Sequence, residues 1–433
     1  MSFSFDSDIR FQSKIKLTVE RHRLENGLKV LFCEDRTVPT VSFMTYINAG
    51  ARDEIKPGTT GLAHVFEHMM FRGTEAYPEY DKAIARFGPE TNASTAHDFT
   101  RYFVNLKSEF LEKIIAIEAD RFQNLTFSNE EFRTELGPVK EERRKGYVDN
   151  PDGFLYSKIY ELAYRVHPYH HPVIGWEEDL EKNMQYTDGL EFFRTYYSPN
   201  NCSISIAGNF SKEAALDAIR KHFAGWKRQE PPSATIPPEP AQTEERGQSF
   251  TWKDSQVTPR IALAFHGPNL NTRSPEYTAL LLISRILFLQ SQRITKQLYT
   301  DLQLVESIFG EPDASKDPGL FLIYANLKKG KSVEEVKGII DEGIDLLLRE
   351  GVSERELQKA RNSISASMLY SLNRPYSIAS ILSFYETVAG DHAAFFEIER
   401  LVRQVAKEDV DEVAAKIFGK ENRTIVTLLP KKE

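Results

Sequence analysis

Alternating apolar and polar positions predict a strand early in each half of this chain of 433 residues. Residues 39–50 (PTVSFMTYINAG) and 258–269 (TPRIALAFHGPN) show the period-two pattern of half-buried β-strands. Each is followed by an apolar segment long enough to form a helix, at 61–71 and at 275–288. The two halves therefore open with the same order of elements.

Local signals predict where several helices begin. Ser274 followed by Pro275 predicts a capped helix with the proline as its first residue. In a capping box, a serine and the glutamate three residues later each accept a hydrogen bond from the other's backbone amide. Three such boxes predict further helix starts: Ser128/Glu131, Ser332/Glu335 and Ser353/Glu356.

A proline-rich stretch separates the two halves. Residues 229–248 contain five prolines and almost no large apolar side chain, which is typical of an extended linker. We therefore expect an N-terminal domain at 1–228 and a C-terminal domain at 249–433. Each half also closes with a strand, at 201–210 and at 422–430. This order predicts an α+β fold of two tandem, homologous α/β sandwiches, each a mixed sheet with helices packed on one face.

Composition limits the class of protein. Apolar residues make up 41% and charged residues 27%, as in ordinary globular proteins, and the net charge of −8 disfavours a nucleic-acid binder. No apolar run approaches the ~18 residues of a membrane span. Residues 1–14 lack the regions of a signal peptide, so we expect a cytoplasmic protein, or a periplasmic one whose signal was removed. Cys33 and Cys202 lie in apolar runs and are predicted to be buried free thiols.

The sequence H-x-x-E-H at residues 64–68 brings metal-binding side chains together. On a helix, His64 and His68 lie on one face, one turn apart, with Glu67 beside them. Two neutral imidazoles and a nearby carboxylate are the groups that zinc hydrolysis requires. The neighbouring residues are apolar, where polar groups without partners are costly to bury. The alternative interpretation is a pair of hydrogen-bonded core histidines.

A catalytic zinc site needs a third protein ligand and keeps one position for water. Residues 128–146 have a helical composition with several glutamates. Glu135 and Glu142 are seven residues apart and so fall on one helix face within about 20°. Glu141 is rotated by about a quarter turn and is expected to face solvent. The alternative for most of these glutamates is a solvated charged helix.

These motifs resemble the pitrilysin, insulysin and mitochondrial processing peptidase family. The H-x-x-E-H pattern is the inverzincin signature. The stretch from INAGARDE to GLAHVFEHMMFRGT, residues 47–74, resembles the first motif of the family. The similarity continues at 91–103, 135–144, 167–175 and 196–210. The resemblance implies a zinc endopeptidase with one Zn²⁺ per chain, built from repeated α+β domains that enclose a chamber.

The resemblance also implies a role for each residue of the site. Glu142, the second glutamate of an E-x₆-E pattern, is implied as the third zinc ligand beside His64 and His68. Glu135 is implied as an outer carboxylate that orients a ligand histidine. Glu67 is implied as the general base that takes a proton from water and passes it to the leaving amine.

One departure from the family pattern lies inside the E-x₆-E segment. Gly137 and Pro138 interrupt it, and a proline in a helix interior usually bends the helix. Glu142 is four residues beyond Pro138, so its helical turn is expected to survive. Glu135 is the position that Pro138 is expected to disturb.

The segment 92–106 (NASTAHDFTRYFVNL) resembles the family's edge strand, which pairs with the substrate main chain. Asn92 and Ala93 match the start of that strand and are implied to bind substrate. Pairing through the backbone favours extended, unfolded peptides over folded proteins.

The HPYHH sequence offers a second group of histidines, His167, His170 and His171. Its prolines place it in a loop, and the family does not use it for metal. We therefore expect no second metal site there.

The second half lacks a residue pair of the family. Family members carry an Arg-x₆-Tyr pair after the first helix of this half, where it contacts substrate across the chamber. The corresponding stretch, 297–311, places Tyr299 and Glu306 at the two positions, and no Arg-x₆-Tyr occurs within 285–330. The chain also has two domains, where single-chain members have four. The resemblance thus implies a heterodimer with a related subunit that carries the pair, with a homodimer as the alternative.

The sequence favours a zinc endopeptidase subunit that cleaves oligopeptides or unfolded segments. A non-catalytic structural subunit of the same fold is the first alternative, and the intact set of His64, Glu67, His68 and Glu142 argues against it. A peptidase that removes presequences is the second alternative. It shares the chemistry, and so the sequence does not separate it from the favoured reading.

Overall fold

The computed structural model describes residues 5–10, 16–230 and 235–431. Contacts within the chain divide it into two compact units, each assembled from several stretches of sequence. The predicted absence of a signal peptide concerns residues 1–14, of which 1–4 and 11–14 lie outside the described residues, as do 231–234 of the predicted linker. The first unit comprises Met1–Glu142, His171–Ile236 and Tyr370–Phe396; the second comprises Arg143–His170, Pro237–Leu369 and Glu397–Glu433.

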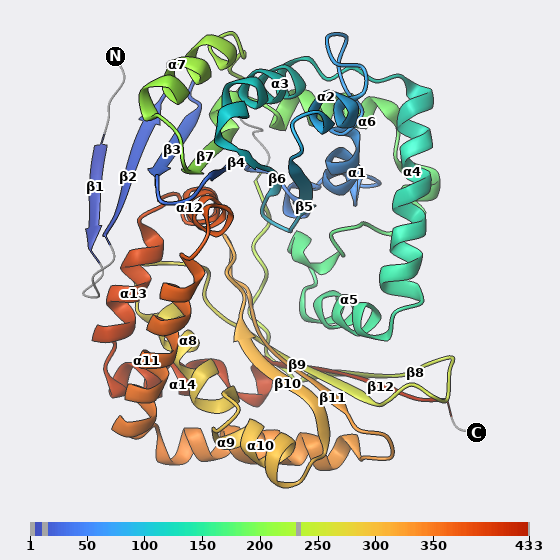
Figure 1. Ribbon diagram of the computed structural model, residues 1–433. Helices are drawn as coiled ribbons and strands as arrows, with labels where there is room; N and C mark the ends of the chain where they lie inside the picture. The colour runs from blue at the N-terminus through green and yellow to red at the C-terminus, as the bar shows by residue number, and fades with distance from the viewer. Residues whose placement is uncertain (1–4, 11–15, 231–234, 432–433) are drawn as a thin grey trace. The chain divides into compact units, whose positions relative to one another are not determined.

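The first unit is built on a mixed sheet with the strand order β1-β2-β3-β7-β4-β6-β5 (Figure 1). Strands β3 and β7 run parallel, and the other neighbours are antiparallel. Strand β7 is buried along its whole length, whereas the burial of β6 alternates next to the edge strand β5. The strands are β1 (Phe5–Arg10), β2 (Lys16–Arg23), β3 (Lys29–Glu34), β4 (Thr40–Ile47), β5 (Glu90–Thr95), β6 (Thr100–Lys107) and β7 (Cys202–Gly208).

Helices cover both faces of this sheet. On one face, α1 (Leu62–Met69) and α3 (Leu111–Asn124) contact β6, α6 (Tyr186–Tyr196) contacts α1, and α7 (Lys212–Phe223) contacts α3. On the other face, α12 (Pro375–Val388) packs on β3, β4 and β7. The remaining helices of the unit are α2 (Tyr80–Ala85) and α4 (Asn129–Arg143).

The second unit repeats this plan on a sheet with the order β10-β11-β9-β12-β8 (Figure 1). Strands β12 and β8 are parallel, and the others are antiparallel. Helix α5 (Pro151–Ala163) packs on β9 and β12, where Leu155 and Ile159 meet Ala262 and Val426. The strands are β8 (Arg246–Thr251), β9 (Arg260–His266), β10 (Val305–Pro312), β11 (Leu320–Leu327) and β12 (Arg423–Leu429); the other helices are α8 (Glu276–Phe288), α9 (Arg293–Thr295), α10 (Val333–Glu350), α11 (Glu354–Ser371), α13 (Ala394–Gln404) and α14 (Lys407–Ile417).

Two helices pack in the unit opposite to the one their sequence position suggests. Helix α5 precedes the proline-rich stretch but belongs to the second unit, and α12 follows that stretch but belongs to the first. Each covers one face of its sheet through an apolar stripe; in α12 this stripe includes Ile378, Ala379 and Leu382. Each sheet therefore has helices on both of its faces, whereas the sequence predicted helices on one face.

The sequence signals match the elements closely. The α+β class and mixed sheets are confirmed, and strands β4, β9, β7 and β12 lie within the four predicted segments. Helix α8 begins at Glu276, so Pro275 is its N-cap and not its first residue. The Ser128 and Ser353 capping boxes form in both directions, whereas at Ser332 only the hydroxyl accepts, from the Glu335 amide.

The structure bears on two further predictions, one about the two cysteines and one about membrane-spanning segments. Cys33 and Cys202 are buried free thiols, as predicted, and burial raises the pKa of Cys33 to about 12. In the described part of the chain, every helix is too short or too polar to cross a bilayer.

A buried carboxylate fastens α12 to the sheet of the first unit. The side chain of Glu386 is fully buried, and its Oε1 accepts from Arg21 of β2 at 2.7 Å and from Lys29 of β3 at 3.0 Å. Its Oε2 accepts from the backbone amide of His392 at 3.3 Å. Burial by itself would raise the pKa of Glu386, but His392 and the two cations hold it below its ordinary value. The carboxylate is thus ionised and paired.

We expect Glu386→Ala to lower the free energy of unfolding by about 2–4 kcal/mol, because removing one member of a buried ion pair leaves its partners uncompensated. Urea unfolding monitored by circular dichroism measures this loss. The control is Glu397→Ala, which removes an exposed carboxylate paired with Arg400 of the same helix. That change should cost less than about 1 kcal/mol. Equal effects of the two substitutions would contradict the anchoring role of Glu386.

Candidate metal centre and peptidase site

Helix α1 (Leu62–Met69) carries the H-x-x-E-H motif, and a carboxylate outside the helix holds its first turn. The backbone amides of Gly61 and Ala63 donate to the two oxygens of Glu54, at 2.7 and 2.6 Å. A carboxylate is favourable there because it satisfies free amides at the positive end of the helix dipole. Burial raises the pKa of Glu54 well above its usual range, against the effect of the two amides.

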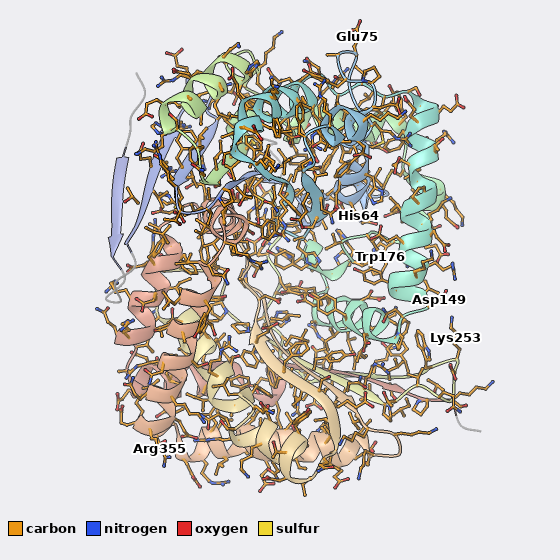
Figure 2. The ribbon with its side chains drawn as sticks, viewed as in Figure 1. His64, Glu75, Asp149, Trp176, Lys253 and Arg355 are labelled. Carbon is orange, nitrogen blue, oxygen red and sulfur yellow. The ribbon has the colours of Figure 1, made fainter. Side chains whose placement is uncertain are left out.

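The loop before α1 packs tightly against a second loop. Gly61 has a φ of 90°, and a Cβ there would lie 2.5 Å from the carbonyl oxygen of Ile174, so only glycine fits. The Thr60 hydroxyl accepts from the backbone amide of Trp176 at 2.9 Å and donates to Asp179. Figure 2 labels Trp176 of this second loop and His64 of α1. These contacts fix where α1 begins and hence where its side chains point.

The two motif histidines lie together, as their spacing predicts. The ring centroids of His64 and His68 are 4.9 Å apart. Both Nε2 atoms face one carboxylate oxygen, Glu142 Oε2 of α4, at 3.7 Å from His64 and 3.4 Å from His68. In the described residues these three side chains form a group whose ligand atoms all lie within 4.8 Å of one another.

The geometry of this group fits a tetrahedral zinc ion. Nitrogen and oxygen ligands bind zinc at about 2.0–2.2 Å, and two such ligands on a tetrahedron lie about 3.3–3.6 Å apart. The separations from Glu142 Oε2 to the two imidazoles, 3.4 and 3.7 Å, are close to this value. They are also longer than ordinary hydrogen bonds. The donor set, two imidazoles and a carboxylate, is the one that leaves an open position for water.

Glu135 fixes the orientation of His68. Its Oε1 lies 3.2 Å from His68 Nδ1, and its Oε2 accepts from Arg72. A proton on Nδ1 directed at Glu135 leaves Nε2 facing Glu142. Helix α4 (Asn129–Arg143) runs through Pro138 without a break, and so the expected disturbance of Glu135 is absent.

The two histidines differ in their electrostatic environment. Burial lowers the pKa of His64 to about 4, with His68 adding to this effect and Glu142 opposing it. The hydrogen bond to Glu135 and the nearby carboxylate of Glu142 raise the pKa of His68 to about 9. At neutral pH the His64 ring is therefore neutral and the His68 ring is protonated, so a metal bound between them would displace a proton from His68.

Glu67 lies beside the two motif histidines and accepts a hydrogen bond from Thr95. Its Oε2 accepts from the Thr95 hydroxyl at 2.6 Å and lies 3.9 Å from His64 Nε2. Burial raises the pKa of Glu67, while the hydrogen bonds from the Thr95 hydroxyl and backbone amide lower it. A carboxylate with a raised pKa beside a metal ligand set has the character of a general base.

Asn92 and Ala93 lie on β5, at one edge of the sheet. They pair with Phe103 and Tyr102 of β6 on the inner side of the strand. The side-chain oxygen of Asn92 accepts from the backbone amide of Ala93 at 2.9 Å. This strand is also in contact with α1, the helix that carries the histidine motif.

The histidines of the HPYHH loop have separate partners. His167 bonds to Asp317 at 3.0 Å, and His170 bonds to the His167 carbonyl at 3.0 Å. His171 Nε2 lies 3.8 Å from the Glu54 carboxylate that caps α1. Their side chains do not form one of the metal-capable groups found in the described residues. A metal-capable group other than that of His64, His68 and Glu142 consists of Glu386, Asp391 and His392, and it contains the carboxylate already paired with two cations.

In the stretch 297–311, neither of the two positions that correspond to the Arg/Tyr pair of the family carries a cation. Tyr299 is 42% exposed, and Glu306 lies on β10, where its carboxylate is 3.4 Å from the Asn326 amide. Arg293 is committed to Glu356 through bonds of 2.7 and 2.9 Å, and it lowers the pKa of that carboxyl to about 2.

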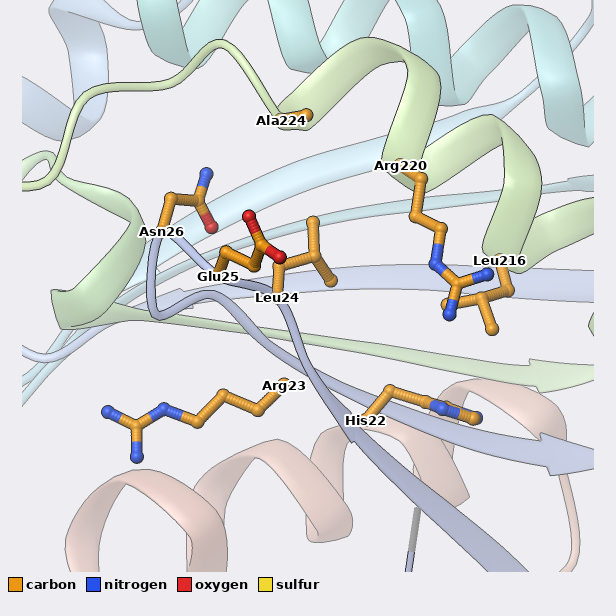
Figure 3. Close-up of a pocket in the computed structure, with 8 residues that line it drawn as sticks. All are labelled: His22, Arg23, Leu24, Glu25, Asn26, Leu216, Arg220 and Ala224. Atoms are coloured by element: carbon orange, nitrogen blue, oxygen red, sulfur yellow. The ribbon is translucent and has the colours of Figure 1, made fainter. Parts of the chain in front are cut away.

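Cavities occur elsewhere in the first unit. One of about 300 Å³ lies between the β2–β3 turn and α7. Arg23 and Arg220 both line it, but Figure 3 shows their guanidinium groups pointing to different sides, so their charges do not converge. A second, of about 520 Å³, lies beside the start of α1 and is lined by Glu54, Leu62 and Phe192 among others.

Sequence reasoning did not single out Glu54, Arg72 or Thr95. Each acts on a motif residue from a distant position: Glu54 on the start of α1, Arg72 on Glu135, and Thr95 on Glu67. The sequence feature that could have pointed to Thr95 is its position in the predicted edge strand, residues 92–106. Alternation along a strand puts it on the same face as Ala93.

Known proteins resemble this chain over almost all of its length. It is 28% identical to the zinc protease PqqE of Helicobacter pylori, over 94% of this chain and 92% of that protein. It is 24% identical to the probable mitochondrial-processing peptidase subunit beta of Arabidopsis thaliana, over 92% of this chain and 76% of that protein. The crystal structure of a protease from Helicobacter pylori matches with a TM-score of 0.87 at 26% identity, covering 95% of this chain and 99% of that one.

Two family models account for most of the sequence. Residues 29–176, which include the histidine motif and both Glu135 and Glu142 of α4, match the model described as insulinase, peptidase family M16. Residues 183–364 match the model described as the peptidase M16 inactive domain. The second match is consistent with the position of His64, His68 and Glu142, which all lie in the first half of the chain. The chain therefore belongs to the insulinase-like peptidases of family M16.

Proposed function

We propose that this chain is a zinc endopeptidase subunit that holds one Zn²⁺ through His64, His68 and Glu142. The observation that carries the proposal is the convergence of these three side chains, with Glu67 3.9 Å from His64. The relatives named zinc proteases support it. A structural subunit of the same fold would gain nothing from burying a metal-binding histidine beside a carboxylate with a raised pKa.

Each protein group has a separate task in the proposed reaction. When bound, zinc would act as a Lewis acid that polarises the scissile carbonyl and makes water more acidic. Glu67 takes the proton of the attacking water and delivers it to the leaving nitrogen. Glu135 keeps the proton of His68 on Nδ1, which leaves Nε2 available for the ligand cluster.

The edge strand β5 supports an extended peptide as the substrate. A peptide added to this edge would pair through its backbone, and a substrate carbonyl would replace the Asn92 side chain as acceptor for the Ala93 amide. Backbone pairing needs a segment without tertiary structure of its own. We therefore propose oligopeptides and unfolded segments as the substrate class. Presequences satisfy the same requirement.

A related partner subunit completes the proposed site. The second half lacks the Arg/Tyr pair, and its nearby arginine, Arg293, is bound to Glu356. Turnover requires the peptide to be held in line as well as activated. One relative is named as a subunit, which supports a two-chain enzyme. We propose a heterodimer, with a homodimer as the alternative.

The metal assignment predicts one zinc per chain, lost on substitution of a ligand. His68→Ala should lose most of its zinc, as measured by elemental analysis after gel filtration. Glu135→Gln should retain zinc but bind it about 10–100-fold more weakly, because a second-sphere partner of the ligand is changed. His170→Ala is the control, since the His170 ring bonds within its own loop, to the His167 carbonyl at 3.0 Å. Full zinc retention in His68→Ala would reject the site.

The general-base assignment predicts that Glu67→Gln keeps its zinc and loses turnover. The expected fall in kcat is about 10²–10⁴-fold, the usual contribution of a general base. Glu141→Gln is the matched control, because it changes an exposed glutamate next to a ligand. A quenched peptide substrate measures both. Near-normal turnover by Glu67→Gln would show that another group moves the proton.

The partner assignment predicts that this chain alone is a weak or inactive peptidase and that a related chain carrying the Arg/Tyr pair restores activity. The measurement is turnover of the quenched peptide by the purified chain, with and without that partner. A partner in which the arginine and tyrosine are replaced serves as the control and should restore little. Full activity from a monodisperse homodimer, unchanged by the partner, would exclude the heterodimer.

A further inference from the structure

The side chain of Thr95 donates a hydrogen bond to Glu67, the proposed general base. Its hydroxyl lies 2.6 Å from Glu67 Oε2. Thr95 is the last residue of β5 and pairs with Thr100 of β6. This short hydrogen bond limits the rotation of the Glu67 carboxylate, which the flexible glutamate side chain would otherwise allow.

The turn after Thr95 is fixed by the segment before α1. The amides of Ala51 and Arg52 donate to the carbonyls of Ala96 and His97, at 3.1 and 2.8 Å. Gly50 approaches so closely that a Cβ would lie 2.3 Å from the Ala96 carbonyl oxygen. Because the strand end is held on both sides, Thr95 is a rigid support for the carboxylate.

Thr95 also connects the base to the strand that is proposed to hold the substrate. Ala93, whose amide lies at the proposed pairing edge, is two residues from Thr95 on the same strand face. The strand thus holds both the peptide and the base through one rigid segment. A misplacement of about 1 Å between reacting groups can cost on the order of 10²-fold in rate.

We infer that Thr95 is a positioning residue for the peptidase reaction, which holds the Glu67 carboxylate in register with a peptide bound along β5. This inference rests on the proposed function of Glu67 as general base. It assigns to Thr95 a role in the chemical step and none in binding zinc. Its loss should therefore lower kcat and leave the metal and KM nearly unchanged.

Three variants separate this role from a structural one. Thr95→Val removes the hydroxyl and keeps the shape of the side chain, and Thr95→Ser restores the hydroxyl. The matched control is Thr91→Val on the same strand face, where the lost hydroxyl donates to the Phe103 carbonyl at 2.9 Å and is not near Glu67. The measurements are kcat, KM, zinc content and melting temperature, each on the chain with its partner. Crystal structures of the Thr95 variants locate the carboxylate.

We expect kcat to fall about 10–100-fold in Thr95→Val, within the range a misplaced general base allows. Thr95→Ser should recover most of the rate, and Thr91→Val should stay within about twofold of the original chain. In the Thr95→Val structure, the Glu67 carboxylate should occupy a new position while His64, His68 and Glu142 do not move.

Several results would overturn the inference. The first is an unchanged kcat in Thr95→Val. The second is a fall in zinc content or in melting temperature that is large enough to account for the lower rate. The third is a Thr95→Ser variant as slow as Thr95→Val. If Thr95→Val does not fold, Thr95→Ser against Thr95→Ala gives the same comparison. Absence of turnover in the original chain with its partner is a different result, since it rejects the proposed function itself.

Discussion

The hydrogen bonds from Gly61 and Ala63 to Glu54 determine where α1 begins, and the site depends on that position. A helix of only eight residues has little stability of its own, so its placement comes from its contacts. Once its start is fixed, the helical repeat fixes the directions of His64 and His68. Glu142 and Glu135 on α4 can then reach the two imidazoles. A capping carboxylate thus orients side chains that it does not touch.

Much of this site could be predicted from the sequence, because helical geometry is local. Spacings of four and seven residues are enough to place two histidines on one face and two glutamates on another. Pro138 was the misleading signal. The ring removes one amide, but Leu136 and Val139 are buried and keep α4 packed and continuous around it. Packing on both sides of the proline outweighed its local cost.

The exchange of α5 and α12 could not be predicted in the same way. Strand alternation and capping boxes show where an element starts and which face is apolar, but not which sheet that face will cover. The apolar stripe of α12 packs on the first sheet, where Glu386 of the same helix also pairs with Arg21 and Lys29. These contacts join residues more than 350 positions apart. Patterns within a short window cannot report them.

The pKa directions in the ligand group suggest how it is organised without a metal. His68 carries a proton at neutral pH because two carboxylates face its ring, whereas burial keeps His64 neutral. The positive charge on His68 offsets part of the electrostatic repulsion between the carboxylates of Glu135 and Glu142. A divalent cation can replace that proton with little movement of the ligands, since the separations already match a tetrahedral ion. The groups proposed to bind zinc therefore hold one another in position through their own charges.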